Sequence, residues 1–318
     1  MVVLLTMRDS LTRRSVLKGA AVGGAASTAG CASSIQGAFG ESTEVTIGGK
    51  QFTEQLLLSN MSALMLEDAG VSINDAFPVG GNTANHEAII GGETTHYWEY
   101  TGTGWNFHLG NEEEKIRDPE ELYNSVNEAY QEEYGIEWLQ TADFNNTYVV
   151  TANTDWQEET GVETLSGLAE YINGGGEVTW AVSQEYINNP TAFGDLPDFY
   201  GYGENMDNVT YERMAIGTIN YRAVAEGEVD LGVGFATNPN LQEFDIATIE
   251  DDQNWFVIYY PAPIVDQDVL NDTVREALNA PVSALDTETM IELNARVSID
   301  EESPENVAQD WLESENLL

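Results

Sequence analysis

The sequence is poor in basic residues, cysteine and long apolar runs, and each shortage excludes a class of partner or structure. It has 11 Lys and Arg against 55 Asp and Glu, and its formal net charge at pH 7 is −44. So acidic a chain repels nucleic acid and anionic lipid, and neither is expected as a partner. Cys31 is the single cysteine, so no disulfide can form within the chain. Beyond residue 30, no run of about 18 apolar residues occurs that would span a bilayer.

The acidity does not indicate a disordered chain, because 42% of the residues are hydrophobic and 10% aromatic, enough for a packed core. We expect instead the surface of a halophilic protein, whose self-repulsion is screened where the Debye length falls to roughly 3 Å. Such a protein should lose structure on desalting, and an undiminished melting temperature in dilute buffer would contradict this. Acidic runs such as 112–114 are interpreted as solvated surface, and neither a metal nor a cofactor is expected.

The N-terminal segment "TRRSVLKGAAVGGAASTAGC" has the features of an export signal. The pair Arg13-Arg14 indicates the route for folded proteins, and a weakly apolar, Ala- and Gly-rich run follows it. The small residues before Cys31 match a lipobox, so residues 1–30 are expected to be removed and Cys31 lipidated. Residues 31–43 would then be a flexible tether on the outer face of the cytoplasmic membrane, with the lipid as the only membrane contact. The alternative is an ordinary signal with an incidental cysteine.

After the tether, predicted strands and helices alternate, which indicates an α/β protein with helices on both faces of parallel sheets. Strands are predicted at 44–49, 95–100, 137–144, 147–152, 177–183 and 228–237, and helices at 53–70, 82–91, 119–135, 164–176, 220–227 and 271–300.

Residues 85–93 ("NHEAIIGGE") resemble residues 220–228 ("NYRAVAEGE") after a shift of 135 positions. Each segment is a predicted short helix, a Gly stop and an acid that precede a strand. The same shift places Phe235 where Tyr100 stands. Because the carboxyl ends of strands face the ligand crevice in open α/β sheets, two lobes would each offer one ring to the cleft between them.

Three segments carry a family resemblance: "VTIGGKQFTEQLLLSNMSALMLEDAG", "GGNTANHEAIIGGETTHYWEYTGTGW" and "NYRAVAEGEVDLGVGFATNPNLQEFDIATIEDDQNWFVIYYPAPIVDQDVL". They resemble substrate-binding proteins of ABC importers for glycine betaine, choline and related osmoprotectants, of the type expected in a halophilic archaeon. The resemblance covers about residues 44–310. It implies a two-lobed periplasmic-binding-protein-like fold (type II), each lobe a mixed, mostly parallel sheet flanked by helices. Lobe one would contain residues 44–145 and 260–318, and lobe two residues 146–259.

By the same resemblance, a box of aromatic rings from both lobes would hold the trimethylammonium head of the ligand. The family motifs place these rings at Tyr100, Tyr148, Phe235 and Tyr259, with Tyr260 as a neighbour that could replace Tyr259. Such rings suit the chemistry, because a quaternary ammonium donates no N–H hydrogen bond and is attracted to the faces of aromatic rings. An uncharged box is expected, since a carboxylate would also bind Na⁺ or K⁺ in brine.

The resemblance also implies a site for the carboxylate of betaine-type ligands. Lys50 and Thr103 match the family's positions, and an Arg usually joins them. Here Asn189 aligns with that Arg, in "SQEYINNPTAFGDLP", and the family's Thr-Asp-Gly turn is Thr237-Asn238-Pro239. The departure at Asn189 removes a fixed positive charge, for which another donor such as Arg213 or Arg222 could compensate.

Catalysis has little support, because His86, His96 and His108 form no HExxH motif and neither G-x-S-x-G nor a P-loop lysine occurs. The expected function is therefore that of an extracytoplasmic solute-binding lipoprotein, not an enzyme. It would be a monomer that captures a quaternary-ammonium osmoprotectant and delivers it to an ABC permease. The alternatives are a binding protein for carnitine or a polyamine, and a secreted hydrolase that uses carboxylates.

Overall fold

The computed structural model describes residues 44–111, 115–188, 190–214 and 218–318. The predicted signal (1–30) and tether (31–43), with the predicted lipidation residue Cys31, lie outside the described residues, as does Asn189.

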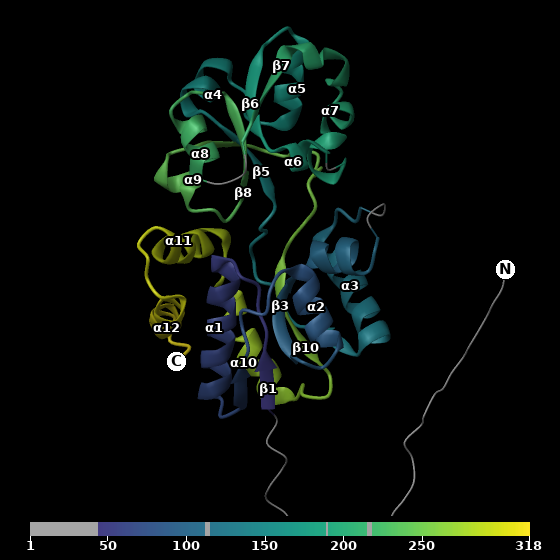
Figure 1. Cartoon of the computed structure of the whole chain (residues 1–318), viewed down its shortest axis with the longest axis vertical. Coiled ribbons are helices and arrows are strands. Elements are labelled where there is room, and N and C mark those ends of the chain that lie inside the picture. Colours follow the sequence, from purple (N-terminus) through teal and green to yellow (C-terminus); the bar gives the residue numbers. More distant parts are fainter. Residues whose placement is uncertain (1–43, 112–114, 189, 215–217) are drawn as a thin grey trace, which may run out of the picture. The chain divides into compact units, whose positions relative to one another are not determined.

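Two five-stranded sheets organise the described residues (Figure 1). In the order of their pairing, the first contains β2 (Ser72–Asp75), β1 (Glu44–Ile47), β3 (His96–Tyr100), β10 (Pro261–Asp266) and β4 (Ile136–Trp138). The second contains β7 (Val209–Arg213), β6 (Val178–Val182), β8 (Leu231–Phe235), β5 (Tyr148–Ala152) and β9 (Ala247–Ile249). All strands of the first sheet fall within residues 44–145 and 260–318, called lobe 1 below. Those of the second fall within residues 146–259, called lobe 2.

The two-lobed α/β fold is confirmed, but the sheets are less parallel than expected. In each sheet two of the four strand pairings are antiparallel, and they involve β10 in lobe 1 and β5 in lobe 2. These are the strands by which the chain enters a lobe from the other one. Each therefore runs away from the other lobe, whereas the neighbours that pair antiparallel with it run towards the other lobe (Figure 1).

Helices cover both faces of each sheet. Those of lobe 1 are α1 (Thr53–Asp68), α2 (Asn82–Ile90), α3 (Pro119–Tyr134), α10 (Asp272–Asn279), α11 (Thr287–Ser298) and α12 (Pro304–Ser314), with the short turns η1 (Thr103–His108) and η4 (Val282–Ala284). Those of lobe 2 are α4 (Thr154–Thr160), α5 (Leu165–Asn173), α6 (Gln184–Asn188), α7 (Leu196–Phe199), α8 (Thr218–Ala225) and α9 (Asn240–Glu243), with η2 (Pro190–Gly194) and η3 (Gly203–Asn208).

Alternation along β3 distributes its large side chains between two cores. Trp98 packs with α1, α10, α11 and α12 on one face of the sheet, and Tyr97 packs with Tyr130 of α3 on the other. Both side chains are fully buried. Tyr100 lies on the same face as Trp98 but at the end of the strand, which frees it from the core and places it beside lobe 2.

Two adjacent chain segments connect the lobes. The amide of Asn146 donates to the carbonyl of Tyr259 (3.1 Å), and the hydroxyl of Thr147 donates to the carbonyl of Val257 (2.7 Å). The crossing segments therefore lie side by side, directly before β5 and β10 (Figure 1). Within the described residues, no helix is long and apolar enough to cross a membrane.

Candidate ligand-binding pocket

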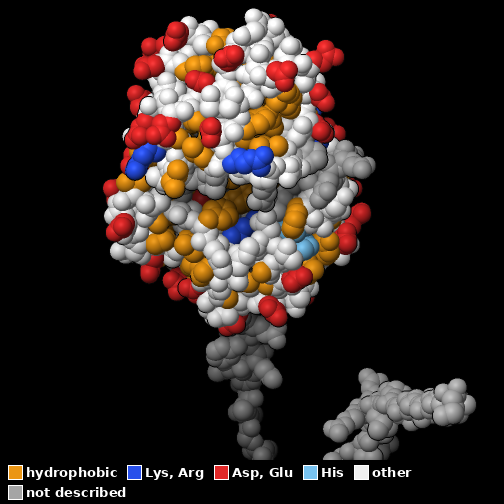
Figure 2. All heavy atoms as spheres, turned by 45° about the horizontal axis from the view of Figure 1, so that its top comes forward, with side chains coloured by type: hydrophobic (Ala, Val, Ile, Leu, Met, Phe, Trp, Pro, Cys, Tyr) orange, Lys and Arg blue, Asp and Glu red, His pale blue; other side chains and the backbone are white. Residues whose placement is uncertain are grey.

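A pocket of about 590 Å³ lies between the lobes and takes its walls from both of them and from the crossing segments. Figure 2 shows it as a hollow in which hydrophobic and basic side chains are visible, below a surface dotted with acidic residues. Its lining residues are Lys50, Phe52, Thr53, Glu54, Asn82, Tyr100, Thr103, Asn146, Tyr148, Phe235, Thr237, Asn238, Pro239, Asn240, Tyr259, Asn294 and Ser298.

The structure brings together the predicted ring residues, which are far apart in the sequence. Tyr100 and Phe235 end the central strands of the two sheets, Tyr148 begins β5, and Tyr259 lies in the second crossing segment. Lys50 and Thr103, predicted for the polar part of the site, also line the pocket. Tyr260 does not appear in the lining.

In lobe 2 the rings form a cluster held by strand register. Tyr148 and Phe235 are direct cross-strand partners of β5 and β8, and their ring centroids are 5.1 Å apart. Tyr186 meets Tyr148 edge-on at 5.1 Å from behind, and Phe256 lies 6.2 Å away. The aromatic wall of lobe 2 is therefore buttressed by further rings rather than by charges.

In lobe 1, Tyr100 is held from three directions. Its hydroxyl donates to Oε1 of Glu54 at 2.5 Å, the Nζ of Lys50 lies 4.9 Å from the ring centroid, and Phe52 stacks at 6.2 Å. Burial, together with the adjacent Glu54 charge, raises the pKa of Tyr100, so the phenol stays protonated and donates. Gly102 permits the close approach of the second crossing segment here, because a Cβ would overlap the carbonyl oxygen of Ile258.

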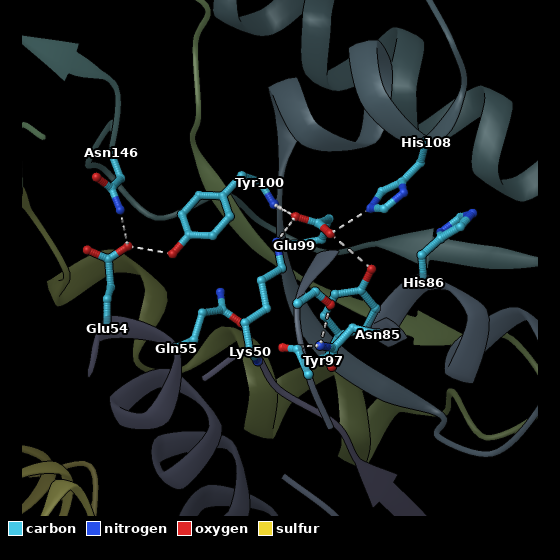
Figure 3. A network of polar contacts seen from close by, with 12 residues as sticks. Lys50, Glu54, Gln55, Asn85, His86, Tyr97, Glu99, Tyr100, His108 and Asn146 are labelled. Atoms are coloured by element: carbon cyan, nitrogen blue, oxygen red, sulfur yellow. Dashed lines mark hydrogen bonds and ion pairs between the residues drawn. The ribbon is translucent and has the colours of Figure 1, made fainter. Parts of the chain in front are cut away.

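Lys50 faces an internal partner, Glu99 (Figure 3). The Nζ–Oε1 distance is 2.5 Å, and Lys50 and Glu99 are 2% and 0% exposed. Glu99 also accepts from the backbone amide of Tyr100 (2.7 Å), the hydroxyl of Tyr97 (3.0 Å) and Nε2 of His108 (3.1 Å). Burial alone would raise the pKa of Glu99, but the Lys50 charge and the bond from His108 lower it to about 2. Burial lowers the pKa of Lys50, and Glu99 opposes that shift.

Glu54 is a pocket residue that the sequence analysis missed. It is 2% exposed and lies in the first turn of α1. Besides Tyr100 it accepts from the side-chain amides of Asn146 (3.0 Å) and Asn294 (3.4 Å). Burial raises its pKa against these hydrogen bonds and one from Thr237. The rings of the box are uncharged, but the lining also includes this buried carboxyl group, which was not among the expected site residues.

Two features of the sequence could have indicated Glu54. It lies four residues after Lys50, in "GGKQFTEQ", and it is the second residue of α1, directly after a segment whose Lys50 and Phe52 line the pocket. An acid in the first turn of a helix normally stabilises the helix dipole in solvent, which explains why it attracted no functional interpretation. Asn146 and Asn294 carried no sequence signal, because their role depends on meeting Glu54, and Thr237 was noted only as part of the turn that departs from the family pattern.

The described part of the chain contains no group of three or more His, Cys, Asp or Glu arranged to hold a metal ion. The lining instead combines apolar rings, neutral amides and hydroxyls, and two buried charges. This arrangement can surround a small organic ion and fix its orientation.

Comparison with known proteins agrees with this geometry. The model of the family described as "Substrate binding domain of ABC-type glycine betaine transport system" matches residues 43–314. The glycine-betaine-binding protein of Pseudomonas aeruginosa is 29% identical over 296 residues, which are 91% of this chain and 93% of that protein. The chemotactic signal transduction system substrate-binding protein CosB of Halobacterium salinarum is 29% identical over 86% of this chain and 84% of its own.

The solved structure of apo YehZ from Escherichia coli has the same fold. It superimposes with a TM-score of 0.74 at 26% sequence identity, over 86% of this chain and 99% of that one.

Proposed function

The chain belongs to the family of substrate-binding domains of ABC-type glycine betaine transport systems, and from this premise we propose that it captures a quaternary-ammonium osmoprotectant between its lobes. The observation that supports the pocket as the capture site is the meeting of Tyr100, Tyr148, Phe235 and Tyr259 around one hollow of about 590 Å³. That size suits a small organic solute.

Aromatic rings fit the chemistry of such a ligand. The charge of a trimethylammonium group is spread over its methyl groups, which bury apolar area and are attracted to the negative faces of rings. Each ring contact contributes roughly 0.5–2 kcal/mol, more where water is excluded. Four such contacts contribute roughly 2–8 kcal/mol before the costs of ordering are subtracted, compared with about 8 kcal/mol for a micromolar affinity.

Delivery would depend on movement of the lobes about the two crossing segments. Phe235 belongs to lobe 2, Tyr100 belongs to lobe 1, and Tyr148 and Tyr259 stand at the crossings. A ligand that contacts all four favours the closed arrangement over the open one by its differential affinity for the two. The closed, loaded protein is then the form that an ABC permease would recognise.

Titration calorimetry in multi-molar salt tests the proposal, with glycine betaine, proline betaine, choline and carnitine as ligands. Binding of at least one is expected, and Tyr100→Ala should weaken it tenfold or more. Phe107→Ala is the matched control, because Phe107 is 53% exposed and outside the pocket lining. Absence of heat for all four ligands would defeat the substrate class, and conversion of any of them to product would favour the hydrolase alternative.

The proposal includes export by the folded-protein route and a lipid on Cys31, so that the pocket faces the outside of the cytoplasmic membrane. Mass spectrometry of the N-terminal peptide from membranes should find an acylated Cys31 as the first residue. Cys31→Ala should release the protein from the membrane fraction. An unmodified Cys31 in a membrane-bound protein would contradict the anchor.

A chemotactic transducer is a second candidate partner, because the Halobacterium relative carries that assignment at the same identity as the betaine-binding one. The two partners predict different losses when the gene is deleted. Loss of ligand uptake indicates a permease, and loss of attraction towards the ligand with uptake intact indicates a transducer.

A further inference from the structure

Lys50 and Glu54 are the charged residues that line the pocket within the described ranges, and they are not equivalent. The ammonium of Lys50 forms an ion pair with Glu99 at 2.5 Å inside the protein. Glu99 is fixed in turn by Tyr97, His108 and the backbone of Tyr100. Lys50 is therefore already neutralised, and a ligand carboxylate would have to compete with a buried, preorganised one for its charge.

Glu54 lacks such a counter-ion. Its hydrogen bonds come from Tyr100, Asn146, Asn294 and Thr237, all uncharged, and no ammonium or guanidinium in the described ranges lies within ion-pair distance of it (Figure 3). A buried carboxylate without a cationic partner is costly. The pocket thus carries one unbalanced negative charge, on its lobe 1 side.

The position of Glu54 suits a bulky cation better than a metal ion. The side chain is 2% exposed, and its oxygens already accept from four uncharged donors. It is therefore poorly placed to coordinate Na⁺ or K⁺ directly, whereas its field crosses the low-dielectric pocket wall and reaches a cation held against the rings. This arrangement combines the charge of Glu54 with the selectivity of aromatic faces.

The neutral groups around Glu54 are also acceptors. Oδ1 of Asn146 and Oδ1 of Asn294 are both buried without a hydrogen-bond partner. Such acceptors are best satisfied by an O–H or N–H donor. The polar end of the pocket therefore favours a ligand group that donates a hydrogen bond and disfavours a second carboxylate.

We propose, on the basis of the proposed function, that the pocket selects quaternary ammonium ions with a neutral, hydrogen-bond-donating tail over zwitterions with a carboxylate, and that Glu54 determines this preference. Choline is an example of the favoured class and glycine betaine of the disfavoured one. They share the trimethylammonium head and differ in the tail, which is a hydroxyl in choline and a carboxylate in betaine. The shared head meets the rings in both cases, so the tail decides.

Calorimetry of the wild-type chain in multi-molar KCl provides the first test, with choline, glycine betaine and glycine betaine amide. The amide has nearly the shape of betaine but a net positive charge and N–H donors. Choline and the amide should each bind at least tenfold more tightly than betaine. Betaine binding as tightly as the other two, or more tightly, would overturn the inference and leave the proposed function standing. No heat of binding for any of the three ligands would overturn both this inference and the proposed function.

The variant Glu54→Gln tests whether this residue is responsible. It keeps the size of the side chain and its carbonyl acceptor but removes the charge, so the preference for choline over betaine should fall at least tenfold. Glu87→Gln is the matched control, because Glu87 lies on the exposed side of α2 in the same lobe and should leave the preference unchanged. An unchanged preference in Glu54→Gln would refute the role of Glu54. If that variant does not fold, the wild-type comparison of betaine with its amide still decides whether a ligand carboxylate is disfavoured.

Discussion

The two lobes have the same plan but bring opposite chemistry to the pocket. Helix α2 and strand β3 in lobe 1 match α8 and β8 in lobe 2 after the shift of 135 residues, and both strands are central in their sheets. Tyr100 ends the one strand and Phe235 the other. Lobe 1 supplies the buried charges of the site, and lobe 2 supplies a wall of rings.

One pair of equivalent positions explains the difference. Glu99 of lobe 1 corresponds to Gly234 of lobe 2, and its carboxylate accepts from the amide of Tyr100 at 2.7 Å. In lobe 2 the hydroxyl of Tyr221 accepts from the amide of Phe235 at 3.1 Å instead. A Cβ on Gly234 would lie 2.7 Å from that hydroxyl, so the tyrosine excludes any larger side chain there. The same backbone group is thus satisfied by a charged residue in one lobe and a neutral one in the other.

Removing the charge from lobe 1 is expected to have the largest effect. Glu99→Ala leaves Lys50 buried without its partner and should lower the free energy of unfolding by about 3–5 kcal/mol. Urea unfolding at constant high salt measures this. Lys50→Met combined with Glu99→Ala should recover a large part of the loss, and a double variant no more stable than Glu99→Ala would refute the pairing argument.

Acid should destabilise lobe 1 through His96, which corresponds to Leu231 in lobe 2. Burial lowers the pKa of His96 to about 4, against the hydrogen bond to Ile264. The unfolded chain, with a pKa near 6.5, takes up the proton first as the pH falls. The contribution of His96 to the free energy of unfolding is therefore complete above pH 6.5. It decreases by about 3 kcal/mol as the pH falls towards 4. Urea unfolding across this window should show a smaller decline in His96→Asn than in the wild type, and equal slopes would contradict the assignment.

Adding bulk to lobe 2 tests the steric half of the comparison. Gly234→Ala should cost about 1–3 kcal/mol, because the added methyl group meets Tyr221. Thermal unfolding in high salt measures the loss. Gly81→Ala is the control, because a Cβ there meets nothing within 4 Å. A loss of stability no larger than that of Gly81→Ala would show that the Tyr221 side chain can move aside without strain.

The smallest expected effect concerns the ligand. Phe235→Ala should weaken binding of the preferred ligand about tenfold, or about 1.4 kcal/mol, because it removes one ring face from lobe 2. Lobe 2 should still fold, since Phe235 is only partly buried. Calorimetry of Phe235→Ala and Tyr100→Ala compares the two equivalent rings. Tyr100→Ala is expected to lose more affinity, because the Tyr100 hydroxyl also positions Glu54. A larger loss of affinity in Phe235→Ala would reverse that ranking.

Much of the architecture could be predicted from the sequence, but the strands β2, β7, β9 and β10 were not among those predicted. In β10, Pro261 and Pro263 argue against a central strand, because proline cannot donate to a ladder. Here the carbonyls of the two prolines accept hydrogen bonds from the backbone amides of Ala142 and Leu139, in the irregular chain after β4. The prolines therefore face irregular chain, and there the missing N–H groups are tolerated. The predicted strand at 137–144 is also too long, since β4 ends at Trp138.

The sequence by itself determined the α/β fold class, because this depends on the alternation of strands and helices, and its resemblance to a known family indicated the ring residues that meet at the pocket. The tertiary structure decided which charged side chains have a counter-ion and which do not. Glu99 is 49 positions from Lys50, and the amides of Asn146 and Asn294 are 92 and 240 positions from Glu54. A charge is neutralised only by a partner within a few ångströms, and distances of that kind between remote residues exist only once both lobes have packed.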